Sequence, residues 1–176
     1  MLRKIAPVLL LVAMQAHATP GYAGRWDLKA IEPVTETTEK PLLYPEGYFS
    51  IEMISAQATI WSSPLGFNAS YQQSTYCHPD FLGGGRFNLA KDEKLQQFVA
   101  QAGGKETVTH TLKTKLGVSF SQFDLIWGIG PGQDGKAPCK DLGNTTFYLT
   151  KDKKHVLFFQ YPYIYRFDGV YGRIGK

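Results

Sequence analysis

The sequence predicts a mainly β fold, an antiparallel β-barrel with one amphipathic helix at about residues 91–102. Aromatic residues make up 14% of the chain, and they favour the pleated, half-buried surface of a strand. The chain also has 18 glycines, which mark turns between short apolar runs. Many short strands separated by turn signals are typical of an antiparallel barrel or sandwich.

The first expected strand covers residues 24–34, where Trp26, Leu28 and Ala30 alternate with charged residues. This pattern is typical of a strand with one buried and one solvent-exposed face. Later runs have similar patterns and are separated by turn residues. These further expected strands cover residues 48–60, 67–76, 107–116, 120–129, 145–150, 156–161, 163–167 and 170–174.

Two of these runs also predict which side chains share a face. Residues 107–116 alternate strictly, which places His110 beside Val108 and Leu112 and predicts a core or pocket histidine. In residues 120–129 the alternation predicts one apolar face. It is formed by Phe123, Leu125, Trp127 and Ile129.

Helical periodicity distinguishes residues 91–102 from the rest of the chain. Leu95, Phe98, Val99 and Ala102 fall at i, i+3, i+4 and i+7, which is one face of a helix. Acidic residues in the first turn interact favourably with the helix dipole, and two glycines directly after the segment end the helix. We expect the apolar stripe of this helix to flank the sheet.

The first 18 residues have the pattern of a secretory signal peptide. Arg3 and Lys4 precede a short apolar run, and small residues at positions 16 and 18 form a cleavage site. The run is about ten residues long, whereas a membrane span needs about twenty. We therefore expect cleavage after Ala18, a single β-barrel domain over residues 19–176, and a location in the periplasm or outside the cell.

Charge argues against a nucleic-acid partner. The formal net charge is +4, and removal of the signal peptide lowers it to about +2, which gives no electrostatic basis for binding nucleic acid. A second apolar stretch of membrane-spanning length is not seen, so we expect no transmembrane segment and a soluble mature protein.

Cys77 and Cys139 are the only cysteines, and in an oxidising compartment two cysteines usually pair. The alternative is a reactive or metal-binding thiol. Neither residue lies in a Cys-x-x-Cys spacing, and the neighbouring His78 and Asp80 have no second ligand pair to complete a zinc site. We therefore predict a disulfide and no metal.

Residues 22–28 read Tyr-Ala-Gly-Arg-Trp-Asp-Leu, which resembles the Gly-x-Trp opening of the calycin group, the lipocalins and small bacterial lipocalin-like domains. The resemblance implies that Gly24 and Trp26 are structural and that Trp26 plugs one end of the barrel. It also implies that an arginine from a late strand, Arg166 or Arg173, packs over the Trp26 ring through a cation–π contact. The helix in mid-chain departs from the usual lipocalin layout.

Aromatic residues gather toward the C-terminus and form the candidate binding residues. By alternation, Tyr161, Tyr163, Tyr165 and Phe167 share one side of a strand. Together with Trp127 they either line a ligand cavity or present an adhesive outer face, and the alternative is an ordinary aromatic core.

These features predict an exported lipocalin-like binding protein for a small apolar or amphipathic ligand. The alternative is a periplasmic inhibitor or immunity-type protein that binds an envelope enzyme through an exposed aromatic patch or a loop such as residues 128–138. A third hypothesis is a hydrolase whose active site is not recognisable from the sequence. The chain has no Gly-x-Ser-x-Gly motif and no phosphate or dinucleotide loop, so we predict no catalytic residue and no cofactor.

Overall fold

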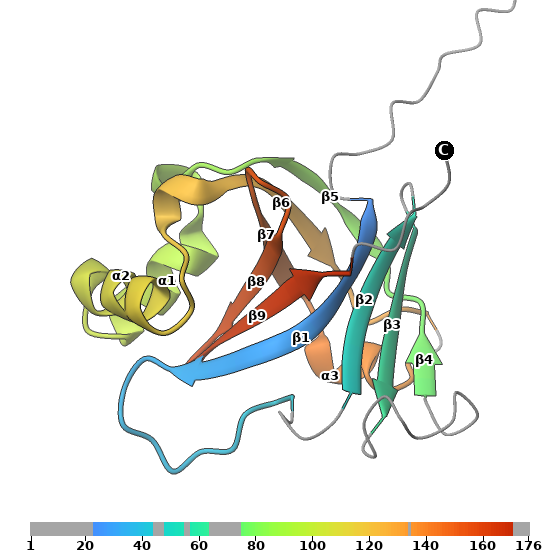
Figure 1. The fold of residues 1–176 in the computed structure, drawn as a ribbon. Coiled ribbons are helices and arrows are strands. Elements are labelled where there is room, and N and C mark those ends of the chain that lie inside the picture. Colours follow the sequence, from blue (N-terminus) through green and yellow to red (C-terminus); the bar gives the residue numbers. More distant parts are fainter. Residues whose placement is uncertain (1–22, 44–47, 55–56, 64–74, 134, 171–176) are drawn as a thin grey trace, which may run out of the picture.

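The computed structural model describes residues 23–43, 48–54, 57–63, 75–133 and 135–170. These residues form one antiparallel sheet that curls into a half-barrel, together with three α-helices, which confirms the predicted mainly β class (Figure 1). The predicted signal peptide lies outside the described residues, as do residues 67–74 of the expected strand at 67–76 and residues 171–174 of the expected strand at 170–174. The strands are β1 (Gly24–Pro33), β2 (Tyr48–Ile54), β3 (Gln57–Ser63), β4 (Thr75–Cys77), β5 (Phe81–Arg86), β6 (Phe123–Ile129), β7 (Thr145–Thr150), β8 (His155–Gln160) and β9 (Tyr163–Gly169). The α-helices are α1 (Glu93–Gln101), α2 (Lys105–Thr114) and α3 (Cys139–Leu142), and short 3₁₀ helices cover Leu89–Lys91 and Phe120–Gln122.

The order of the strands places the free edges of the sheet in mid-sequence. The order is β4-β3-β2-β1-β9-β8-β7-β6-β5, so the first and last strands pair and every other neighbour is consecutive in sequence. The two edge strands, β4 and β5, are joined only by residues 78–80. We call the gap between these two strands the seam.

The seam is fastened by covalent and hydrogen bonds. Cys77, the last residue of β4, forms a disulfide with Cys139, the first residue of α3, with an S–S distance of 2.03 Å, which confirms the predicted pairing. The backbone N–H of Gly130 donates to the carbonyl of Asp80 over 2.8 Å. The edge at β4 is therefore tied to the segments that follow β6 and precede β7.

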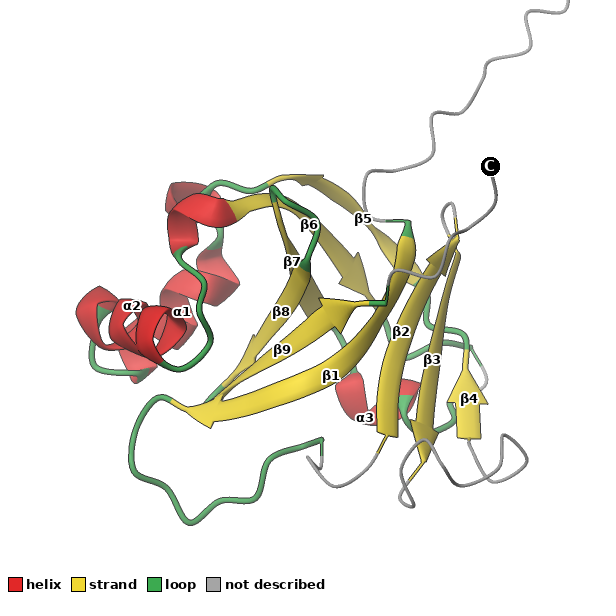
Figure 2. Ribbon diagram, viewed as in Figure 1, coloured by secondary structure: helices red, strands yellow, loops and turns green. Residues whose placement is uncertain are grey.

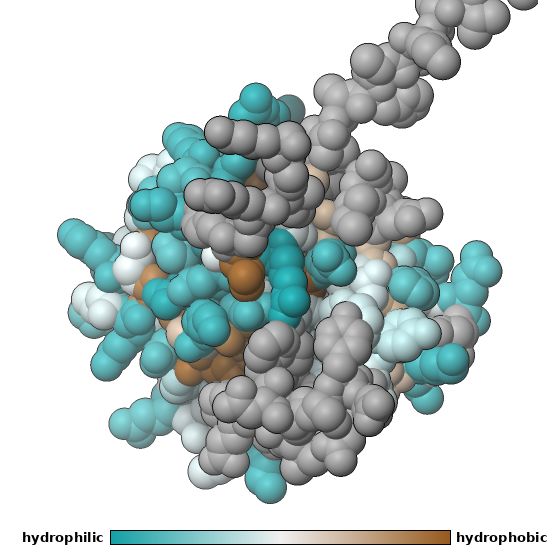
Figure 3. Space-filling model, turned by 45° about the vertical axis from the view of Figure 1, so that its right-hand side comes forward, coloured by the Kyte–Doolittle hydropathy of each residue, from teal (hydrophilic) through white to brown (hydrophobic). Residues whose placement is uncertain are grey.

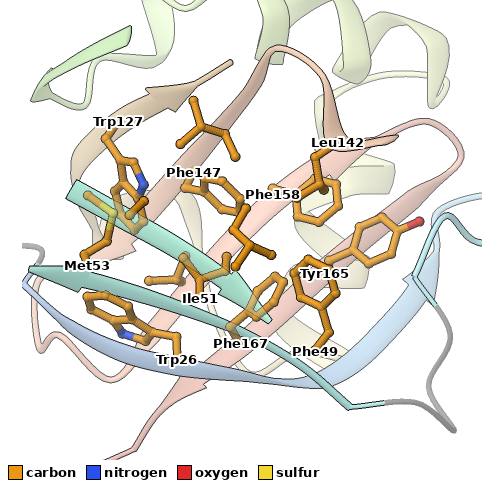
Figure 4. Packing of buried hydrophobic residues seen from close by; sticks show 14 of the residues in the cluster. Trp26, Phe49, Ile51, Met53, Trp127, Leu142, Phe147, Phe158, Tyr165 and Phe167 are labelled. Carbon is orange, nitrogen blue, oxygen red and sulfur yellow. The ribbon is translucent and has the colours of Figure 1, made fainter. Parts of the chain in front are cut away.

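An inner core fills the concave side of the curled sheet (Figure 4). Its aromatic rings pack closely: the ring centroids of Trp26 and Trp127 are 5.9 Å apart, and Trp127 stacks on Phe147 at 5.4 Å. Phe158 and Tyr165 stack at 4.1 Å. Aromatic packing of this kind contributes more than its buried area alone.

A second core, the outer core, lies between helices α1 and α2 and the convex face of β6–β9 (Figure 2). Leu95 and Phe98 of the predicted amphipathic helix are buried in it, so the expectation that this helix flanks the sheet is confirmed. Asp92 caps α1, because its Oδ1 accepts from the backbone N–H of Leu95 over 3.0 Å. Strands β7 and β8 are thus covered on both faces, which accounts for the consecutive apolar residues at 147–149 and 156–159.

The predicted strand at 107–116 is wrong, because this segment forms helix α2 and its end. Val108, Leu112 and Leu116 recur every four residues and are buried in the outer core. Apolar residues spaced four apart fit the period of a helix as well as that of a strand, so alternation alone did not distinguish a helix from a strand here. His110 is exposed on the helix and is not a core or pocket histidine.

Two β-bulges reverse the expected faces within strands. The register shifts between Leu28 and Ala30 in β1, so Ala30 packs against the outer core while Trp26 and Leu28 belong to the inner one. A similar shift between Phe123 and Leu125 in β6 places Phe123 in the outer core. The predicted single face in residues 120–129 is therefore divided, because each extra residue turns the following side chains to the other side.

Gly24 and Trp26, the two defining residues of the Gly-x-Trp pattern, both lie in β1. Trp26 is 3% exposed in the inner core. A methyl group added at Gly24 would lie 3.3 Å from the Trp26 ring, at a φ of +151° that side chains disfavour. Glycine at this position lets the indole lie flat against the strand.

We expect replacement of Trp26 by alanine to lower the free energy of unfolding by about 3–5 kcal/mol, since it removes a buried indole from the centre of the inner core. Urea unfolding of the mature protein measures this loss. The matched control is Trp61→Ala, because Trp61 is half-buried on the convex face of β3. Equal losses in the two variants would show that Trp26 has no special role in the core.

Candidate functional site

Three of the predicted ligand-lining residues are fully packed in the inner core. Trp127, Tyr165 and Phe167 are 0%, 1% and 0% exposed. Neighbouring side chains therefore enclose these three almost completely. They pack against other buried residues of the inner core, and we interpret them as core residues.

The two remaining aromatic residues of the predicted set lie elsewhere. Tyr163 is half-buried at the edge of the inner core. Tyr161 lies in the turn between β8 and β9 and is 42% exposed, with its ring 6.3 Å from that of Phe98 on α1. The structure therefore groups Tyr163, Tyr165 and Phe167 and separates Tyr161 from them.

The tyrosine hydroxyls of β9 fasten the segment that follows β1. The Tyr165 hydroxyl accepts from the backbone N–H of Leu42 over 2.8 Å, and the Tyr163 hydroxyl donates to the carbonyl of Glu39. Burial raises the pKa of Tyr165 to about 12, although its hydrogen bonds from the backbone oppose the shift. These residues position a loop beside the barrel.

Arg166 lies on the opposite face of β9 from Tyr165 and Phe167, and so away from Trp26. Its guanidinium donates to the carbonyl of Leu116 over 2.7 Å and pairs with Asp168 at 3.0 Å. Arg166 therefore anchors the end of α2 to the sheet and does not make the cation–π contact that the resemblance implies. The alternative, Arg173, lies outside the described residues.

An aromatic patch covers the convex face of β3 and β4, beside the seam. Trp61 and Tyr76 are direct cross-strand neighbours with ring centroids 5.1 Å apart, and the Tyr76 ring meets that of His78 edge-on at 5.7 Å. His78 Nδ1 is 3.2 Å from the hydroxyl of Thr59. Tyr76 is 54% exposed, although its strand neighbour Cys77 is buried.

A loop from the end of β6 extends this patch across the seam. A methyl group added at Gly132 would lie 2.6 Å from the carbonyl oxygen of His78, so the loop backbone presses directly on the residue that follows β4. At Gly130 an added methyl would lie 3.5 Å from Leu82 of β5, a side chain that is 57% exposed. The loop thus contacts both sides of the seam.

We call this combined region the seam surface: Trp61, Tyr76, His78, Leu82 and the loop at residues 130–133. Figure 3 turns the β2–β4 side toward the viewer and shows pale side chains of intermediate hydropathy on that side. Large exposed aromatic and aliphatic groups held on a rigid backbone are suited to binding. The predicted interpretation of residues 77–80 as a structural loop beside a disulfide agrees with this arrangement, since an oxidised Cys77 is not a thiolate ligand.

Sequence reasoning missed the pairing of Trp61 with Tyr76. A signal was present, because each residue directly adjoins an inward-facing one, Ile60 or Cys77, and so faces outward. What the sequence does not give is the strand register that brings them together. Across the residues with described positions, His, Cys, Asp and Glu form no group of three that would hold a metal ion. The same part of the chain contains no helix with the length and apolarity to cross a bilayer.

Comparison of the chain with protein-family models, with curated proteins and with solved structures finds no match.

We expect the unfolding free energy to fall as the pH rises from about 10 toward 12, because burial of Tyr165 favours its neutral phenol in the folded state. Below pH 10 the Tyr165 phenol is neutral in both the folded and the unfolded state, so the free energy of unfolding keeps its full value. Above it the unfolded chain ionises first, which lowers the stability by about 2 kcal/mol at pH 12. Urea titrations across this range measure the loss, and a Tyr165→Phe variant that keeps the full slope would assign it to other groups.

Proposed function

We propose that this chain is an exported binding protein that recognises a hydrolytic enzyme of the cell envelope through the seam surface. The observation that carries the proposal is the contrast between interior and exterior. The predicted ligand-lining side chains Trp127, Tyr165 and Phe167 are packed, whereas Tyr76 and Leu82 are more than half exposed on the two sides of the seam.

The chemistry of the seam surface fits a protein partner. Tyrosine and tryptophan dominate the residues that contribute most to protein interfaces, because they offer large rigid surfaces with a polar edge. Trp61 and Tyr76 restrain each other by ring contact, so little side-chain freedom is lost when a partner binds. The adjacent loop at residues 130–133 supplies backbone groups that can bind a cleft.

Two features support export, and a third supports a distant relation to calycins. The signal-peptide pattern of residues 1–18 and the Cys77–Cys139 disulfide both fit an oxidising compartment, the periplasm or the exterior. The buried Trp26 behind Gly24 fits a lipocalin-like barrel, and the position of Arg166 departs from that pattern.

The interior binding of a small apolar ligand stays a second prediction from the resemblance. It requires the stacked rings of the inner core, such as Phe158 and Tyr165 at 4.1 Å, to move apart. Binding of a protein partner at the seam surface does not require the inner-core rings to move.

The test is binding and inhibition of purified envelope hydrolases, a muramidase, an amidase and an endopeptidase, by the mature protein and by Tyr76→Ala. We expect one hydrolase to bind, and the variant to bind it at least tenfold more weakly, because the truncation removes the most exposed ring of the surface. Tyr161→Ala is the matched control, since Tyr161 is also an exposed tyrosine but lies beside α1.

Unchanged affinity for Tyr76→Ala, or equal losses in both tyrosine variants, would show that the seam surface is not the interface. The absence of binding to all three classes of hydrolase would contradict the proposed partner.

A further inference from the structure

A small hollow lies between the start of α1, the loop before β7 and the convex face of β7 and β8. Its volume is about 190 Å³, and none of its lining residues belongs to the seam surface. Its floor is formed in part by Leu95, Tyr148 and Phe159, which are residues of the outer core or packed against it. The hollow is therefore held by elements that the fold already fixes.

Polar groups surround this apolar floor. Asn144 and Thr146 line the hollow from the loop before β7 and from β7 itself, and Lys94 lines it from α1. The Lys94 ammonium donates to the carbonyl of Asn144 over 3.3 Å, which holds the charge at the lining. Among the described residues that line the hollow, Lys94 is the only charged one.

The charges behind the floor favour one orientation for a ligand. Asp92 does not line the hollow, but its carboxylate lies beside the buried Tyr148 hydroxyl, and burial together with this carboxylate raises the Tyr148 pKa. Tyr148 is therefore a neutral phenol at physiological pH. A negative ligand group is disfavoured at the Tyr148 end and favoured at the Lys94 end.

We propose that this hollow binds a small organic monocarboxylate, with its carboxylate at Lys94 and its short apolar part against Phe159 and Tyr148. The volume equals that of roughly six water molecules and is below the range of sites for drug-sized ligands, so the ligand has fewer than about ten non-hydrogen atoms. The single positive charge matches one carboxylate, and the Asn144 and Thr146 side chains supply neutral hydrogen-bonding groups.

The test uses butyrate as the probe and its neutral isostere butyramide as the comparison, titrated at constant ionic strength into ¹⁵N-labelled mature protein. We expect saturable shifts of the amide signals of Lys94, Leu95, Asn144 and Thr146 with butyrate, and at least fivefold weaker binding of butyramide. Lys94→Gln should weaken butyrate binding at least fivefold and leave butyramide unchanged.

Lys91→Gln is the matched control, because Lys91 is an exposed lysine just before α1 that does not line the hollow. Both lysine variants remove one exposed charge, so folding is not at issue. Linear, unsaturable shifts with butyrate, equal affinity for the two probes, or equal losses in the two lysine variants would each overturn the proposal.

Discussion

The fastening of the two edge strands at the seam is the constraint on which the rest of the structure depends. Because β1 pairs with β9, the free edges fall at β4 and β5, which are adjacent in sequence. Unpaired edges invite association with other chains, and the Cys77–Cys139 disulfide and the Gly130–Asp80 hydrogen bond fasten this one. The same fastening holds the loop at 130–133 against His78 and so creates the seam surface.

The positions of the helices determine which parts of the sheet are buried and which are exposed. Helices α1 and α2 cover β6–β9, and within the described ranges no helix covers the convex face of β3 and β4. Aromatic residues therefore have two roles: Trp26 and Trp127 stabilise the inner core, and Trp61 and Tyr76 remain at the surface. The two proposed sites lie on the two halves of the sheet, a protein-binding one beside the seam and a carboxylate-binding one beside α1.

Patterns that depend on local chemistry were predictable from the sequence. The amphipathic helix, the strands at both ends of the chain and the disulfide follow from periodicity, turn residues and cysteine count. Three features did not follow: helix α2, whose apolar spacing of four fits both periods, the bulges at Leu28–Ala30 and Phe123–Leu125, and the pairing of Trp61 with Tyr76. Each depends on register or packing between distant segments, which a single sequence does not record.

The most direct test of the central claim is amide hydrogen exchange of the Cys77→Ser/Cys139→Ser variant against the wild type. If the disulfide fastens the seam, protection falls in residues 75–86 and at the end of β6, while β8 and β9, paired on both sides, keep theirs. Unchanged protection beside the seam would contradict the account, as would a uniform loss throughout the sheet.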